Sequence, residues 1–119
     1  MAQNRKPISE NVICYSGLIR EFLRGAVRLH ILHHAALGEV HGAWMANELA
    51  HHGYQISPGS LYPTLHKMET EGLLRSSQHV VDGRARRSYV ATAKGRRTLE
   101  STKRQLRELA NEVLGNETP

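Results

Sequence analysis

The sequence contains a single cysteine, Cys14, so it cannot form an internal disulfide. This agrees with a reducing compartment. No stretch approaches the roughly 18 to 20 continuous apolar residues that a membrane span needs. The first residues are polar and lack the apolar core of a signal peptide. We therefore expect a cytoplasmic protein that does not associate with a membrane.

The residue patterns that support catalysis are also missing. There is no glycine-rich phosphate loop, no constellation of paired carboxylates and no nucleophile with an identifiable base partner. Ser57 is better explained as the cap of a helix than as a nucleophile. We expect no enzymatic activity and no cofactor.

Positive charge, by contrast, is abundant and unevenly placed. The 119 residues fit a single domain and carry a formal net charge of +5. Residues 58–97 hold eight Lys and Arg against three acidic residues, so the whole excess lies in this middle segment. A basic segment of this kind favours a polyanionic partner.

Helical periodicity predicts two helices in the first half of the chain. Apolar residues recur at three- and four-residue spacing from Ser16 to about Leu37, as in an amphipathic helix. Gly25 either kinks this helix or divides a short leading helix from the main one. A short second helix follows and is closed by Gly53 as its C-terminal cap.

A third helix has the clearest start signal. Ser57 suits the N-cap and Pro58 suits the first helical position, and Gly72 stops the helix after about residue 71. Pro63 lies inside this segment and removes the amide that would bond the Gly59 carbonyl. Either the helix is kinked or tightened there, or it begins later than Pro58.

The remaining pattern predicts a hairpin and one more helix. Residues 73–81 and 86–91 read as strands joined across Asp82-Gly83, a strong hairpin turn signal. Thr92 then caps a long helix. Three helices, a two-stranded hairpin and a last helix make a mainly α (α+β) winged helix-turn-helix. We expect one structural domain, with an N-terminal arm (1–15), a DNA-binding part (16–91) and a C-terminal dimerisation helix (92–119).

In this fold the third helix enters the major groove of DNA and the hairpin, or wing, reaches the flanking backbone. A core stripe of Leu61, Leu65 and Met68 turns the opposite helix face outward by helical geometry. The wing carries long cationic side chains that can reach phosphates or a narrow minor groove. The predicted DNA-binding residues are Gly59, Ser60, Tyr62, Pro63, His66, Lys67, Arg84, Arg86 and Arg87.

The last helix has an apolar seam with a seven-residue repeat. A chain this small can bury that seam only partly against its own core, so we expect a homodimer that binds an inverted-repeat operator. The alternative is a seam that packs wholly within one subunit. The predicted dimerisation residues are Leu99, Thr102, Leu106, Leu109 and Val113.

Three stretches together resemble the PadR family of bacterial transcription regulators: Ser57-Pro58-Gly59-Ser60-Leu61-Tyr62-Pro63-Thr64-Leu65, then Glu69-Thr70-Glu71-Gly72-Leu73, then Gly83-Arg84 through Tyr89 and Thr92 to Gly95. The resemblance implies a homodimeric repressor released by an effector, with Tyr62, Lys67 and the wing arginines at DNA-contacting positions. It is closest to the short form with a single C-terminal helix. Where the family usually has His-Gly-Tyr, this chain has His41-Gly42-Ala43.

Other interpretations rest on single features. His30 and His34 stand at the i,i+4 spacing of two metal ligands on one helix face, so a metal-responsive regulator is one alternative. Trp44 lies one step off the apolar face of the second helix and is a candidate for stacking on an aromatic effector between subunits. A winged helix that binds only another protein is a further alternative, because fold does not determine function.

Overall fold

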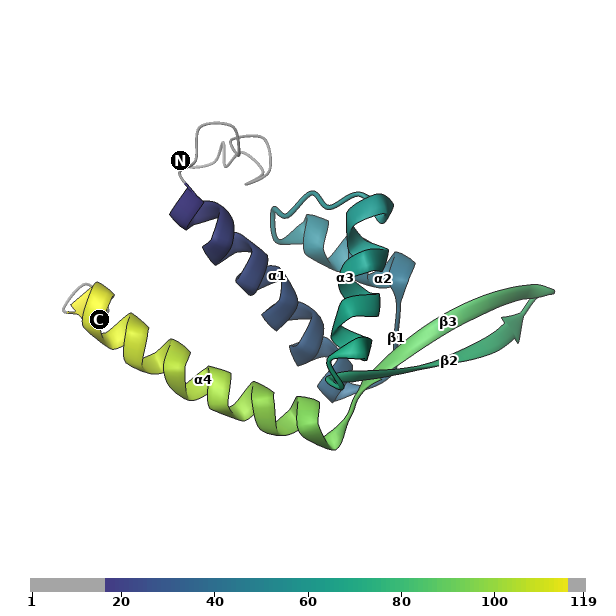
Figure 1. The fold of residues 1–119 in the computed structure, drawn as a ribbon. Helices are drawn as coiled ribbons and strands as arrows, with labels where there is room; N and C mark the ends of the chain where they lie inside the picture. The colour runs from purple at the N-terminus through teal and green to yellow at the C-terminus, as the bar shows by residue number, and fades with distance from the viewer. Residues whose placement is uncertain (1–16, 116–119) are drawn as a thin grey trace.

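The computed structural model describes residues 17–115. They form α1 (Gly17–Leu37), β1 (Val40–His41), α2 (Gly42–His51), α3 (Pro58–Thr70), β2 (Leu74–Val81), β3 (Arg84–Ala91) and α4 (Ala93–Leu114) (Figure 1). The predicted winged helix-turn-helix is confirmed. The predicted N-terminal arm, residues 1–15, lies outside the described residues. No helix within residues 17–115 is both long and apolar enough to cross a membrane.

The first helix, α1, has nearly the span predicted, from Ser16 to about Leu37. It continues as one helix through Gly25, so the alternative in which Gly25 divides off a short leading helix is wrong. A glycine costs about 1 kcal/mol relative to alanine within a helix, and the packing of a 21-residue amphipathic helix offsets that cost. The C-terminal half of α1 carries its buried residues, Ile31, Leu32 and Ala35.

The third helix, α3, begins at Pro58 and contains Pro63, so the alternative of a later start is wrong. Ser57 occupies the N-cap with extended backbone angles, but its side chain makes no capping hydrogen bond. The Ser57 carbonyl instead accepts hydrogen bonds from the amides of Ser60 (2.9 Å) and Leu61 (2.8 Å). The left-handed backbone of Gly72 (φ 83°) directs the chain out of the helix, as predicted.

The sheet has three antiparallel strands in the order β1-β3-β2, one more than predicted. β1 pairs Val40 with Tyr89 and was missed because two residues are too short for a periodic signal. β2 and β3 pair over eight residues, so β3 begins two residues earlier than expected. Asp82 (φ 54°) and Gly83 (φ 76°) both take the left-handed conformation that a tight type I′ hairpin turn requires.

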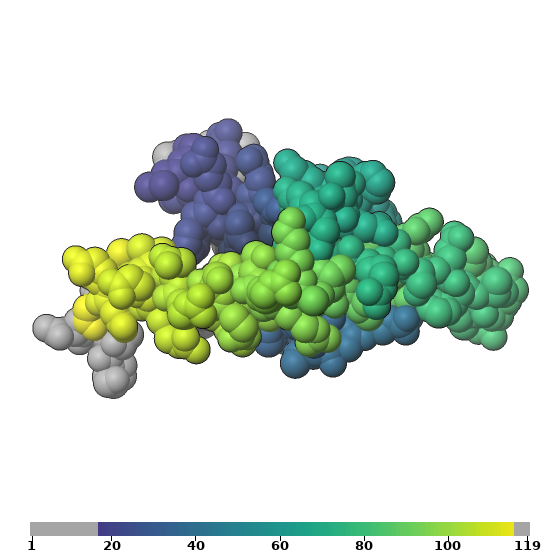
Figure 2. All heavy atoms as spheres, turned by 60° about the horizontal axis from the view of Figure 1, so that its bottom comes forward, coloured from purple at the N-terminus to yellow at the C-terminus, as the bar shows by residue number. Residues whose placement is uncertain are grey.

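The core lies where the three N-terminal helices meet the base of the sheet, and α4 joins it only at its first turns (Figure 1). The Thr92 hydroxyl caps α4 by accepting a hydrogen bond from the Gly95 amide at 2.9 Å, as predicted. Only Gly95 and Leu99 of α4 are buried. The rest of the helix extends away from the core, opposite the protruding wing (Figure 2).

Candidate nucleic-acid interface

One face of α3 packs into the core and the other is free. Leu61, Leu65 and Met68 are buried, which confirms the predicted core stripe. The outward side chains include one that the sequence analysis missed: Thr70 is exposed and lies on the same helical face as Pro63 and His66. The predicted residues of this helix are all exposed: Gly59, Ser60, Tyr62, Pro63, His66 and Lys67.

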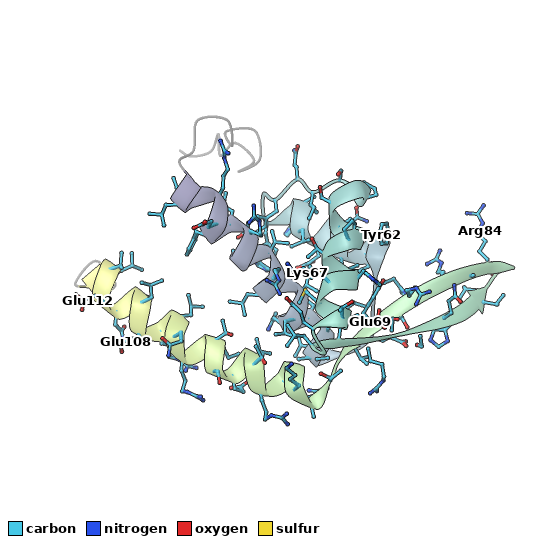
Figure 3. All side chains as sticks on the ribbon, viewed as in Figure 1. Tyr62, Lys67, Glu69, Arg84, Glu108 and Glu112 are labelled. Atoms are coloured by element: carbon cyan, nitrogen blue, oxygen red, sulfur yellow. The ribbon has the colours of Figure 1, made fainter. Side chains whose placement is uncertain are left out.

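Tyr62 has a second role, because its ring packs on the start of α2. A Cβ atom placed on Gly42 would lie 2.5 Å from Tyr62 Cε1 and 2.9 Å from its hydroxyl oxygen. Gly42 therefore permits a close approach that no other residue allows. The ring remains 48% exposed, so it links α2 to α3 while it faces solvent. Figure 3 shows Tyr62 near the N-terminal end of α3.

The C-terminal end of α3 is held by the two long helices. Arg28 of α1 forms a partly exposed ion pair with Glu71. Lys94 of α4 donates a hydrogen bond to the Glu71 carbonyl at 2.9 Å, and the Thr92 hydroxyl donates one to the Gly72 carbonyl at 2.5 Å. The orientation of α3 is therefore coupled to α1 and α4.

The three predicted wing arginines are exposed, but they do not share one face of the wing. Arg84 lies directly after the turn, near the tip of the wing (Figure 3). Arg86 pairs with His79 and Arg87 pairs with Gln78, so strand alternation places Arg87 on the opposite face from Arg84 and Arg86. The sequence could place these residues on the wing, but the strand register decides their faces.

Arg87 belongs to a chain of hydrogen bonds that links the wing to α3. Its guanidinium donates to Ser76 Oγ at 3.0 Å. The Ser76 hydroxyl and amide in turn donate to Glu69 of α3, at 2.7 and 3.3 Å. Glu69 therefore faces the wing (Figure 3). The sequence analysis missed this contact because its partners lie on three different elements.

The opposite face of the wing is anchored by Glu39, just before β1. Glu39 Oε2 accepts a hydrogen bond from the buried Ser88 at 2.7 Å and lies 3.2 Å from His79 Nε2. These hydrogen bonds, from Ser88 first and then from His79, lower the pKa of the Glu39 carboxyl group. Glu39 therefore stays ionised at neutral pH beside the base of the wing.

The predicted dimerisation seam is divided between core and solvent. Leu99 is buried and Thr102 is half-buried, whereas Leu106, Leu109 and Val113 are 47%, 48% and 67% exposed. A cleft of 370 Å³ separates α1 from α4 beside this seam. Its walls are mostly apolar and include Phe22, Ala26, Leu29, Tyr54, Leu99 and Leu106.

The histidine-rich junction of α1 and α2 contains the two candidate metal ligands, His30 and His34. The His30 ring lies 5.0 Å from the His52 ring, and His34 Nε2 lies 3.5 Å from Glu48 Oε2. Burial, followed by the charge of neighbouring histidines, lowers the pKa of His30, and burial is also the main cause of the lowered pKa of His34. Among residues 17–115, no three His, Cys, Asp or Glu side chains are arranged to hold a metal ion.

Trp44, the candidate for stacking on an effector, is 45% exposed at the start of α2. Its ring meets the His34 ring nearly edge-on, with the centroids 5.2 Å apart. The indole lines a pocket at the end of α1.

Comparison with known proteins agrees with this architecture. Residues 31–101 match the model of the transcriptional regulator PadR-like family. The chain is 64% identical over 100 residues to the transcriptional regulator Rv3488 of Mycobacterium tuberculosis (strain ATCC 25618 / H37Rv), which covers 84% of this chain and 94% of that protein.

Solved structures of PadR-type regulators have the same fold. A PadR family regulator from Eggerthella lenta is 26% identical, with a TM-score of 0.73 over 88% of this chain and 91% of its own. The PadR-like regulator BC4206 from Bacillus cereus is 29% identical, with a TM-score of 0.73 over 83% of this chain and 98% of its own. With its matched sequence model, its winged helix and these relatives, the chain belongs to the PadR-like family of transcriptional regulators.

Proposed function

We propose that this protein binds an inverted-repeat operator in duplex DNA as a homodimer and represses transcription until an effector releases it. One observation carries the proposal: the free face of α3 and the arginine-bearing wing are joined by the Glu69–Ser76–Arg87 hydrogen bonds. The two elements that must meet DNA together are thus held in one orientation.

Within this interface, the residues divide into two roles. Lys67 and the wing arginines supply positive charge for phosphates, which determines affinity and its dependence on salt. The outward face of α3 would lie in the major groove, where His66 and Tyr62 reach base edges or phosphates. The first turn of α3 adds the exposed Ser60 hydroxyl, which can donate to a phosphate.

The homodimer is supported by the exposed seam of α4. Leu106 and Leu109 are half-exposed and continue the line of the buried Leu99, and Leu106 lines the apolar cleft. A partner helix would remove this surface from water. Two-fold symmetry would then present two copies of α3 to half-sites about 34 Å apart, one turn of DNA.

The first experiment is selection of the purified protein against random-sequence DNA at near-physiological salt, followed by sequencing of the bound fraction. An enriched inverted repeat would support the proposal. Failure to enrich any sequence, with a folded protein confirmed by circular dichroism, would contradict it and favour a winged helix that binds another protein.

Charge reversal in the wing tests the same interface directly. The double variant Arg84→Glu, Arg86→Glu should abolish binding to the selected DNA, while Glu108→Gln on α4 should bind normally. For the unmodified protein, a plot of log K against log salt should fall with a slope of about −0.9 per neutralised phosphate. A flat salt response, or unchanged binding by the double variant, would contradict the assignment of the wing.

A further inference from the structure

A pocket of 410 Å³ lies where α1 ends, β1 passes and α2 begins, apart from the α1–α4 cleft. Two large apolar side chains at this pocket face solvent, Leu37 (74% exposed) and Trp44 (45% exposed). The His34 ring lies edge-on against the indole, and its lowered pKa, caused mainly by burial, favours the neutral ring. The walls therefore offer one aliphatic and two aromatic surfaces, which suit a planar aromatic ligand.

The polar side of the pocket is acidic. Glu39 lines it with a side chain that is 49% exposed, and hydrogen bonds from Ser88 and His79 converge on one of its oxygens, Oε2. These bonds fix the carboxylate at the pocket. His41, a second polar lining residue, has a buried Nδ1 atom with no hydrogen-bond partner. A negative charge beside aromatic walls complements a positively charged aromatic molecule.

We propose that this pocket binds a small planar aromatic cation, which stacks on Trp44 and places its positive group beside Glu39. An aromatic anion of the same size would meet repulsion from Glu39 and bind far more weakly.

The segment that forms this pocket contacts both DNA-binding elements. Glu39 holds the base of the wing through Ser88 and His79, and β1 pairs with β3. Three residues after Glu39, Gly42 packs against the Tyr62 ring of α3. We therefore infer that the ligand changes operator affinity by shifting this segment against α3 and the wing. This step rests on the proposed DNA-binding function.

The single tryptophan makes binding directly measurable. Protein labelled with 5-fluorotryptophan has one ¹⁹F resonance, from Trp44. Three matched probes would be titrated: 2-naphthylmethylammonium, the neutral 2-naphthylmethanol and the anionic 2-naphthoate. We expect a saturable shift of the resonance with the cation, a weaker response to the alcohol and none to the anion. No saturable shift with the cation, or equal binding of cation and anion, would overturn the proposal.

Two variants and a control locate the site. Glu39→Gln should weaken cation binding about three- to tenfold, as expected for a partly exposed charge pair. Leu37→Ser, at a position too exposed to affect folding, should also weaken it, whereas Glu108→Gln on the outer face of α4 should not (Figure 3). Unchanged affinity in both pocket variants would overturn the assignment. So would a ¹⁹F shift that follows protein concentration without ligand, because a second copy would then cover Trp44.

The regulatory consequence has a separate readout. Affinity for the selected operator duplex would be measured with and without saturating 2-naphthylmethylammonium, and we expect a severalfold change that Glu39→Gln reduces at the same ligand concentration. Ligand binding with unchanged operator affinity would overturn the coupling but not the site. The ¹⁹F titration contains no DNA, so its outcome is independent of whether the protein binds an operator.

Discussion

At the scale of single residues, the first turn of α4 depends on the absence of a side chain at Gly95. A Cβ atom there would overlap the carbonyl oxygen of Leu73 and come within 3.2 Å of Leu32 Cδ1. Gly95 is buried, and its amide also binds the Thr92 cap. This close contact holds the first turn of α4 against Leu73, which follows α3.

We predict that Gly95→Ala lowers the free energy of unfolding by about 1–3 kcal/mol, because α4 must move away from a backbone oxygen that cannot yield. Gly25→Ala in α1 is the matched control: nothing lies within 4 Å of its added methyl group, so the higher helix propensity of alanine should stabilise the protein by about 0.5–1 kcal/mol. Urea unfolding followed by circular dichroism measures both. Equal effects of the two substitutions would refute the close contact.

At the scale of elements, the junction of α1 and α2 contains a group of histidines around one carboxylate. After burial, the charges of His52, His34 and His33 lower the pKa of His30, and Glu48 is the one acidic residue among residues 17–115 that raises it. The pKa values of His30 and His34 lie below the usual 6.5 chiefly because of burial. Both rings are therefore held neutral in the folded protein more strongly than in the unfolded chain.

This difference predicts an acid sensitivity. As the pH falls through 6.5, the unfolded chain takes up protons at these two sites before the folded protein does, so the free energy of unfolding should fall. In the double variant His30→Gln, His34→Gln, stability should depend less on pH across this window. His66→Gln, on the exposed face of α3, should retain the dependence. Urea unfolding between about pH 7.5 and 5.5 measures it, and an identical slope in all three proteins would contradict the explanation.

At the scale of the whole molecule, α4 and the wing protrude from opposite ends of a small core (Figures 1 and 2). The inner face of α4 is apolar beyond Leu99, and its outer face carries Glu108 and Glu112 (Figure 3). Exposed leucines on a helix that extends from the core are costly for an isolated subunit. The shape therefore favours association of two copies.

We predict that Leu106→Glu with Leu109→Glu converts the protein from a dimer to a monomer, because two charges would have to be buried in an apolar interface. The monomer should remain folded, since neither residue belongs to the core. Light scattering coupled to size exclusion measures the mass, and Glu108→Gln between them serves as the control. An unchanged dimer mass in the double variant would exclude this seam.

Several local features of this protein were predictable from short stretches of sequence. The start of α3 at Pro58, the turn at Asp82-Gly83 and the Thr92 cap each depend on residues within a few positions of one another. Backbone preferences, capping and periodicity act over that distance. For the same reason, the exposed side of α3 could be predicted from its core stripe alone.

Tertiary structure decided how these parts are joined. Glu39 and Ser88 are separated by 49 positions, Arg28 and Glu71 by 43, and no local pattern encodes such pairs. The two residues of β1 have no strand signal of their own, and they form a strand because β3 offers hydrogen-bond partners. The strand register decides which face of the wing each arginine occupies, and packing between distant segments forms the pocket at Trp44. Both depend on contacts that form only once the chain has folded.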